Sequence, residues 1–276
     1  MPASDVPLIS VLPLATPTLP PATHTNCYFV GRERVFVVEP ATYDANDRTR
    51  LFDALDRVQA DGRTIAGVIL THHHVDHVGS AALVRDRLGV PVIAHATTRE
   101  LLRGVVEVDE LIDEGSSIDL GLGDRASVLF TPGHAPGHIV LFIERSGEMI
   151  AGDMVAGIGT ILIDPDEGDM GRYISELSRL ASFSPKVLMP AHGPAVEPAV
   201  ERLEGYVAHR GMREAKVLMA LEQLGASTSF ELLPLAYSDA PSTLYPIAER
   251  SCLAHLLKLV REGRVEAKGG RFSLAG

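Results

Sequence analysis

The stretch THHHVDHVGS, residues 71–80, places four histidines and an aspartate directly after the apolar run that ends at Leu70. Imidazoles and carboxylates are the ligands that a zinc-like divalent ion takes in proteins, and a catalytic ion keeps one position open. Residues two apart in an extended loop project to the same side. We therefore expect His72 and His74 to bind one ion, and Asp76 and His77, turned the other way, to bind a second.

Two metal sites need more ligands than this loop carries, and three later positions can supply them. His134 in TPGH, Asp153 in AGD and His192 in PAHG each follow a short apolar run and lie beside a glycine, which lets the backbone approach closely. With the loop they make seven candidate ligands. His138, four residues beyond His134, is interpreted as a structural or supporting histidine because both sites are already filled.

A pair of metal ions about 3.5–4 Å apart can share a water and lower its pKa from 15.7 towards about 7, which yields a hydroxide nucleophile. Such chemistry needs no serine or cysteine nucleophile. We expect Asp76 to be the catalytic residue that orients this hydroxide and accepts its proton. Two zinc ions are the expected cofactors, with manganese or iron as alternatives.

Strands and helices alternate through the part of the chain that positions these residues. Leu51, Leu55 and Val58 share one face of a predicted helix at 47–60, and Gly89 ends another that begins near Ser80. Strands are predicted at 8–14, 25–30, 34–39, 64–70, 90–95 and 186–193, with several short ones between 108 and 151. A helix at 166–183 should turn Ile174, Leu177 and Leu180 inward, and the acidic residues 164–167 before it are interpreted as a solvated loop.

The character of the chain changes near residue 200. A long helix at 199–224, a short one at 229–237, a third at 246–262 and a two-stranded ribbon at 263–274 make the layout of a winged helix. In the third helix, Leu253, Leu256, Leu257 and Val260 are spaced as a core face. The predicted domains are 1–200 and 201–276.

Composition narrows the classes of function. The 276 residues carry a net charge of −11 and an isoelectric point near 5.4, which argues against coating nucleic acid or an anionic membrane. No apolar stretch approaches the roughly 20 residues of a spanning helix, and the start of the chain lacks the pattern of a signal peptide. Cys27 and Cys252 lie far apart, without the spacing of a disulfide framework. A cytoplasmic protein with no membrane partner is expected.

The ordered set His72-x-His74-x-Asp76-His77, Gly-His134, Gly-Asp153 and Ala-His192-Gly resembles the metallo-β-lactamase-fold hydrolase superfamily, over roughly residues 8–200. The resemblance implies an α/β fold, an αββα four-layer sandwich with the metals at one edge between two sheets. It also implies an allocation of ligands: the first metal takes His72, His74 and His134; the second takes Asp76, His77 and His192; and Asp153 bridges them.

Within that superfamily the chain is most similar to the β-lactamase-like protein 2 group, which joins the catalytic domain to a C-terminal winged helix. The stretches EGDMGRYISEL, MPAHGP, HRGMREAKVL and LAHLLKLVREGRVE carry this resemblance. One departure is Glu39-Pro40, where such proteins usually show Asp-Pro. No cysteine lies at a motif, so hydrolysis of β-lactam antibiotics is not the expected native role. The group includes thioesterases and an endoribonuclease that acts on single-stranded RNA.

The leading prediction is a dinuclear metal-dependent hydrolase that uses a metal-bridging hydroxide on an ester or thioester, a small-molecule or carrier-linked acyl substrate. A metal-dependent endoribonuclease is the alternative. Residues 206–276 hold nine Lys and Arg against seven Asp and Glu, which leaves a net charge of −13 on residues 1–205. So acidic a domain is poorly suited to a polyanionic backbone. The C-terminal segment is only faintly basic and its helices are occupied by packing, so it is interpreted as a cleft wall or homodimer surface, with nucleic-acid binding as the less favoured alternative. A mononuclear iron dioxygenase using His72, His134 and Asp153, and a non-enzymatic regulator, are the remaining hypotheses.

Overall fold

The computed structural model describes residues 6–276, which form two compact units. The first contains the chain up to residue 131 together with 136–160 and 184–199. The second contains 132–135, 161–183 and 200–276. Two internal segments therefore belong with the C-terminal part of the chain. The simple division at residue 200 remains a prediction.

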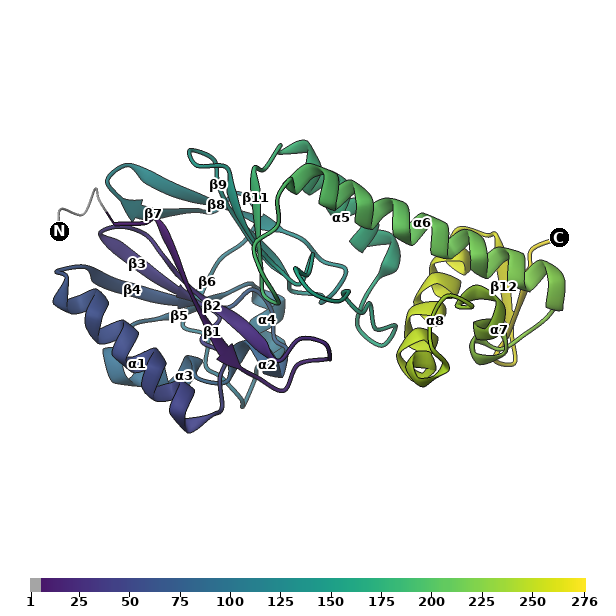
Figure 1. Ribbon diagram of the computed structural model, residues 1–276, viewed down its shortest axis with the longest axis horizontal. Helices are drawn as coiled ribbons and strands as arrows, with labels where there is room; N and C mark the ends of the chain where they lie inside the picture. The colour runs from purple at the N-terminus through teal and green to yellow at the C-terminus, as the bar shows by residue number, and fades with distance from the viewer. Residues whose placement is uncertain (1–5) are drawn as a thin grey trace. The chain divides into compact units, whose positions relative to one another are not determined.

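The first unit is built on two β-sheets (Figure 1). The strands of one sheet follow the chain in spatial order, and those of the other run in the order β11-β10-β9-β8-β7. The first sheet contains β1 (Ile9–Ala15), β2 (His24–Val30), β3 (Arg34–Val38), β4 (Thr64–Ile69), β5 (Val92–Ala94) and β6 (Glu110–Leu111). The second contains β7 (Ser117–Gly121), β8 (Asp124–Phe130), β9 (Ile139–Ile143), β10 (Glu148–Gly152) and β11 (Val187–Pro190).

Two hydrophobic layers hold this unit together. Between the sheets lie side chains such as Tyr28, Ile69 and Ile139, each at most 1% exposed. On the outer face of the first sheet, α1 (Ala45–Ala60) and α3 (Ala81–Leu88) bury Leu51, Leu55, Val58 and Val84 against it, as the predicted helical face requires. Strands buried on both faces read as continuous apolar runs, which explains why they stand out in the sequence.

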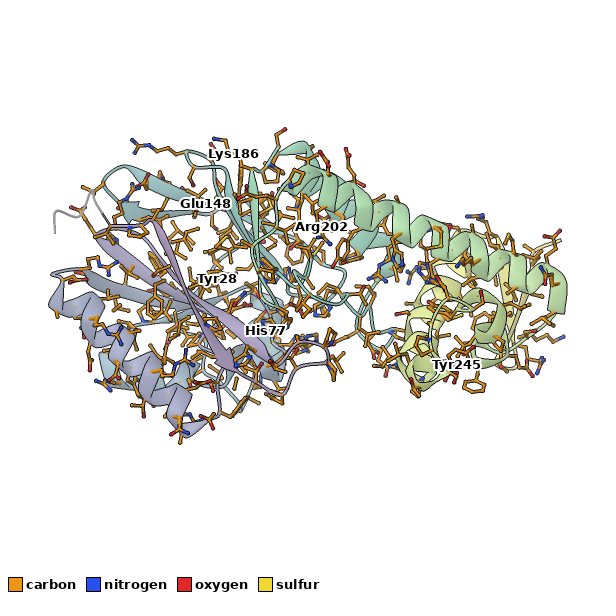
Figure 2. The ribbon with its side chains drawn as sticks, in the orientation of Figure 1. Tyr28, His77, Glu148, Lys186, Arg202 and Tyr245 are labelled. Atoms are coloured by element: carbon orange, nitrogen blue, oxygen red, sulfur yellow. The ribbon has the colours of Figure 1, made fainter. Side chains whose placement is uncertain are left out.

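Parallel pairing brings the candidate ligands to one end of the sandwich. β3 pairs with β4 in parallel, and β10 pairs with β11 in parallel. The carboxyl ends of parallel strands lie at the same edge, so the residues that follow β10 and β11 emerge together. Glu148 begins β10 and Lys186 precedes β11, and Figure 2 shows both at the end of the sandwich away from His77.

The second unit contains α5 (Met170–Ser182) and the C-terminal elements. These are α6 (Ala199–Leu224), α7 (Ser229–Ala236), the 3-10 turn η2 (Ser242–Leu244), α8 (Tyr245–Arg261), β12 (Val265–Lys268) and β13 (Arg271–Leu274). The predicted helix-helix-ribbon layout is confirmed, with α6 at the predicted bounds. Among the described helices, none is both long and apolar enough to cross a bilayer.

Two predicted helix faces need correction. In α8 only Leu256 of the four predicted core residues is fully buried; Leu253, Leu257 and Val260 are half-buried. The core face also uses the small residues Ala248 and Cys252, together with Leu259, because α8 shares its core with α7.

In α5, the predicted inward residue Ile174 is only half-buried, and Tyr173 takes the inward place beside the buried Leu177 and Leu180. The apolar stripe is therefore turned by about one residue. Tyr173 was not predicted as a core residue because a tyrosine combines an apolar ring with a polar hydroxyl.

Candidate metal centre

The histidine-rich loop follows β4 and turns into a helix sooner than expected. His74 has extended dihedrals and is the N-cap of α2 (Val75–Val78). The prediction of an extended loop through residue 77 is therefore wrong, because a helix rotates successive side chains by about 100°. His72 and His74 lie in one group of metal-capable atoms and Asp76 and His77 lie in another, while a third group, Glu39 with His72 and His77, overlaps both. The assignment of these pairs to two separate ions remains a prediction.

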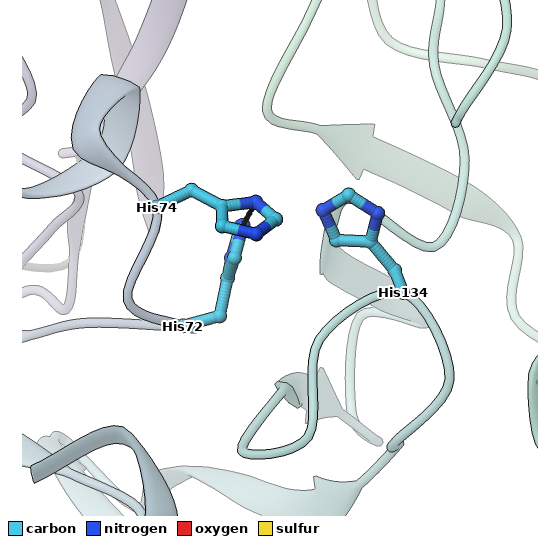
Figure 3. Close-up of side chains that lie close together, drawn as sticks. All are labelled: His72, His74 and His134. Carbon is cyan, nitrogen blue, oxygen red and sulfur yellow. Dashed lines mark hydrogen bonds between the residues drawn. The ribbon is translucent and has the colours of Figure 1, made fainter. Parts of the chain in front are cut away.

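The first group is made of three imidazoles, His72, His74 and His134, whose candidate ligand nitrogens all lie within 4.8 Å of one another. His72 Nε2 is 2.9 Å from His74 Nδ1. Figure 3 shows the three side chains of this group. Three nitrogens at such spacing can coordinate one small cation.

The second group is made of Asp76, His77 and His192, again with candidate ligand atoms within 4.8 Å. Asp153 faces the same two imidazoles. Its oxygens lie 3.7 Å from His77 Nε2 and 3.5 Å from His192 Nε2, and those of Asp76 lie 3.8 Å and 3.5 Å from the same nitrogens. Two imidazoles and two carboxylates thus converge on one point.

The chemistry of this second group fits a bound cation. His77 Nε2 is buried and has no hydrogen-bond partner among the described residues, although two carboxylates lie nearby. Burial favours the neutral form of Asp153, but His77 and His192 outweigh it and hold the pKa of that carboxyl well below its usual range. An ionised carboxylate beside an orphaned ring nitrogen is a donor set for a divalent metal ion.

One buried carboxylate orients an imidazole in each group. Glu39 follows β3, is fully buried, and accepts a hydrogen bond from His77 Nδ1 at 2.7 Å. It also accepts the hydroxyl proton of Thr71, so the Thr71 oxygen must accept from His72 Nδ1, 2.9 Å away. Both rings therefore carry a proton on Nδ1 and direct Nε2 towards the candidate sites.

Glu39 was not among the predicted site residues. Burial lowers the pKa of His77, but the Glu39 and Asp153 carboxylates outweigh that effect and raise it well above its ordinary value. The signal available in the sequence was a carboxylate directly after a buried strand. Its backbone has φ of 57°, a conformation that glutamate adopts only when its surroundings enforce it.

The other histidines are oriented by backbone groups. His192 Nδ1 donates to the His24 carbonyl at 3.0 Å, and His134 Nδ1 donates to the Leu162 carbonyl at 2.9 Å. Because a carbonyl only accepts, each ring directs Nε2 to its group. His138 instead lies 2.8 Å from the Thr131 hydroxyl and accepts from the Asp153 backbone N–H at 3.0 Å. These hydrogen bonds agree with the interpretation of His138 as a structural histidine, and its supporting role for a metal site remains a prediction.

A cavity of about 480 Å³ is lined by neighbours of His192, although none of the seven candidate ligands lines it. His24 and Gly193 line it, and His192 is joined to both: it donates to the carbonyl of the first and precedes the second in the chain. Its lining is mostly apolar, with Val11, Pro13, Ala22, Tyr28, Ile158, Met189 and Ala195, and also includes the polar residues Thr23, Asn26 and Arg50. The cavity can hold an apolar group near His24 and Gly193, the neighbours of His192.

Residues 20–192 match the family described as the metallo-beta-lactamase superfamily, and residues 228–272 match the beta-lactamase associated winged helix domain. The chain belongs to the metallo-beta-lactamase superfamily. Superfamily members are generally hydrolytic enzymes that bind divalent metals. The predicted family, α/β sandwich and appended winged helix are confirmed.

Superfamily relatives match over most of the chain. A beta-lactamase-like protein 2 homolog of Caenorhabditis elegans is 27% identical over 88% of this chain and 80% of its own length. An atrochrysone carboxyl ACP thioesterase of Aspergillus fumigatus is 24% identical over 90% of this chain and 80% of its own. The crystal structure of a metallo-beta-lactamase family protein from Thermus thermophilus covers 98% of this chain and 99% of its own, with a TM-score of 0.79 and 24% identity. That last similarity shows the fold alone.

Proposed function

We propose that this chain is a dinuclear metal-dependent hydrolase of an ester or thioester with an apolar acyl group. The observation that supports it is the convergence of Asp76, His77, His192 and Asp153 beside the three imidazoles of the first group. In this proposal His72, His74 and His134 would hold one divalent ion, Asp76, His77 and His192 would hold the other, and Asp153 would be shared between them. Zinc is the proposed metal.

Bound cations at these positions would supply an acidified water and polarise the carbonyl of the substrate. The protein's own groups do the rest. Asp76 is half-buried at the second group, and we assign to its carboxylate the orientation of the attacking water and the acceptance of its proton. Glu39 and the carbonyls of His24 and Leu162 keep the rings fixed while this proton moves.

The acyl substrate is inferred from the apolar cavity beside His192 and from the acidic charge of residues 1–205. A mostly apolar cavity suits an acyl chain. The name of the Aspergillus fumigatus relative, an atrochrysone carboxyl ACP thioesterase, supports a carrier-linked thioester as the substrate.

The test combines metal analysis with a substrate panel. Purified protein should contain close to two zinc ions per chain, and it should hydrolyse acyl thioesters faster than lactones, β-lactams or single-stranded RNA under the same conditions. Treatment with a chelator should abolish the activity, and added metal should restore it. One iron with oxygen uptake, or cleavage of RNA alone, would contradict the proposal.

A further inference from the structure

The loop 161–169 connects His134 to the C-terminal helices, and every contact described below lies within the second unit. Leu162 in this loop provides the carbonyl that accepts from His134 Nδ1 at 2.9 Å. The loop also contacts the backbone next to His134, because Asp169 N–H donates to the Gly133 carbonyl at 2.8 Å. The ring of His134 and the chain beside it are thus both attached to one loop.

Gly133 adds a steric restraint to that attachment. Its φ is 150°, and a Cβ at this position would lie 2.5 Å from the backbone nitrogen of Tyr173, at the start of α5. So close an approach leaves the segment before His134 little freedom to move away from α5. The orientation of the His134 ring therefore depends on where the loop 161–169 itself is held.

Arginines from the C-terminal helices hold that loop. Arg250 in α8 donates from Nε to Asp164 Oδ2 at 2.9 Å and from Nη2 to Asp166 Oδ2 at 2.5 Å. Arg210 in α6, which is 4% exposed, donates to the Ile161 carbonyl, one residue before Leu162. The expectation of a merely solvated acidic loop is wrong here, because two of its carboxylates are paired with one guanidinium.

The pairing of Arg250 and Asp164 is stronger than a chance surface contact. A second hydrogen bond from Arg250 Nη2 reaches Asp164 Oδ1, so the guanidinium grips this carboxylate with two donors. These hydrogen bonds lower the pKa of Asp164, and Asp164 also accepts the Gly168 N–H through its carbonyl at 2.7 Å. We call this two-donor interaction of Arg250 with Asp164 the fork. Because Asp164 also binds Gly168, the fork restrains both ends of the turn at 164–168.

We propose that Arg250 is a positioning residue for His134, acting through Asp164 and the Leu162 carbonyl. The winged helix thereby sets the orientation of one ligand of the first metal site. This inference rests on the proposed function in one respect, the assignment of His134 as a metal ligand. Groups that orient a ligand ring in this way typically change metal affinity by about 10–100-fold when they are removed.

Two variants of the full chain disrupt this fork from its two sides: Arg250→Ala removes both donors, and Asp164→Asn removes the charge and the Oδ2 acceptor. Asp164→Asn keeps the Oδ1 acceptor that the Asp166 N–H uses. The matched control is Arg271→Ala, which removes an arginine of the same unit that binds Glu231 and the Ala226 carbonyl, away from the loop. Because these arginines are partly exposed, all three variants should fold with melting temperatures close to the wild type.

The first measurement needs no metal. In metal-free wild-type protein, the ¹⁵N chemical shifts of His134 should report a proton on Nδ1, and both fork variants should shift the ring towards a mixture of tautomers. The second measurement is zinc affinity by competition with a chelator. The ratio of the zinc dissociation constants of the two sites should change by about 10–100-fold in Arg250→Ala and Asp164→Asn, and it should stay unchanged in Arg271→Ala.

Unchanged His134 shifts together with wild-type affinity at both sites in Arg250→Ala and Asp164→Asn would overturn the inference. Failure of the proposed function looks different: wild-type protein would bind no zinc, or His134→Ala would bind it as tightly as the wild type. The His134 shifts of the metal-free variants would still decide the positioning role in that case.

Discussion

The Glu39 carboxylate lies 2.7 Å from His77 Nδ1, and both side chains are completely buried. The same carboxylate reaches His72 through the Thr71 hydroxyl. One residue at the end of β3 therefore sets the protonated nitrogen of one imidazole in each candidate metal group. Metal ligands depend on such partners for ring orientation and basicity.

Replacing Glu39 should weaken metal binding without touching a proposed ligand. Glu39→Gln keeps an acceptor oxygen but removes the charge, so we expect a loss of about 10-fold in zinc affinity; Glu39→Ala removes the acceptor, and about 100-fold is expected. Competition with a chelator measures both. The control is Glu144→Gln, at an exposed carboxylate that accepts a hydrogen bond from the Ser127 hydroxyl at 3.4 Å. Wild-type affinity in both Glu39 variants would refute the role.

Asp76→Ala should remove turnover while the fold persists. The proposed proton acceptor contributes about 100-fold or more to kcat, the usual range of general base catalysis. Asp76 lies in a four-residue helix beyond the sheets, so the melting temperature of the metal-free protein should barely change. Rates should be compared with metal saturating, next to Asp86→Ala, an exposed aspartate. Full activity in the metal-loaded variant would eliminate Asp76 as the base.

His138→Ala should destabilise the protein. The ring is fully buried, and its loss would leave a cavity and deprive both the Thr131 hydroxyl and the Asp153 N–H of a partner. A cost of about 3 kcal/mol in the free energy of unfolding is expected. Urea denaturation measures it. The exposed His209 provides the comparison, since His209→Ala should cost less than about 0.5 kcal/mol.

His255 should make stability depend on pH. Burial, followed by the charges of Arg210, Lys258 and Arg213, lowers the pKa of this histidine to about 3. In the unfolded chain the value is about 6.5, so between these pH values the unfolded state binds the extra proton. The stability associated with neutral His255 is therefore complete above pH 6.5 and is lost as the pH falls towards 3.

The size of this effect follows from linkage, at about 1.4 kcal/mol for each pH unit inside the window. Between pH 7.5 and pH 5 the wild type should lose roughly 2 kcal/mol that His255→Gln does not lose. Urea unfolding of both proteins at the two pH values gives the comparison. Parallel losses in wild type and variant would show that His255 titrates normally.

Filling the apolar cavity should discriminate among substrates by chain length. Ala22 lines the cavity from the segment between β1 and β2 and is half-buried, so Ala22→Trp can be accommodated without disturbing either sheet. The KM for long acyl thioesters should rise by about 10-fold, the equivalent of one lost apolar contact of about 1.4 kcal/mol, while that for acetyl thioesters stays the same. A uniform change for all chain lengths would argue that acyl groups bind elsewhere.

Much of this architecture is written locally in the sequence. The helix at 199–224 has the bounds that its apolar spacing predicts. The strands before Thr71 and Asp153 are visible as apolar runs because both their faces are largely buried, and the strand before His192 is apolar although its burial alternates. The seven candidate ligands stand out through side-chain chemistry alone, since clustered imidazoles and strand-end carboxylates have few other uses. Whether they bind metal as assigned remains a prediction.

Tertiary structure alone decided which groups orient those ligands. Glu39 meets His77 across 38 residues of sequence, and Arg250 meets Asp164 across 86. Hydrogen bonds of this kind cannot be predicted from a periodic sequence pattern, because they depend on how sheets and helices pack and not on the local spacing of residues. The early helical turn at Val75 and the inward Tyr173 have the same origin: packing selected among conformations that the local sequence allowed.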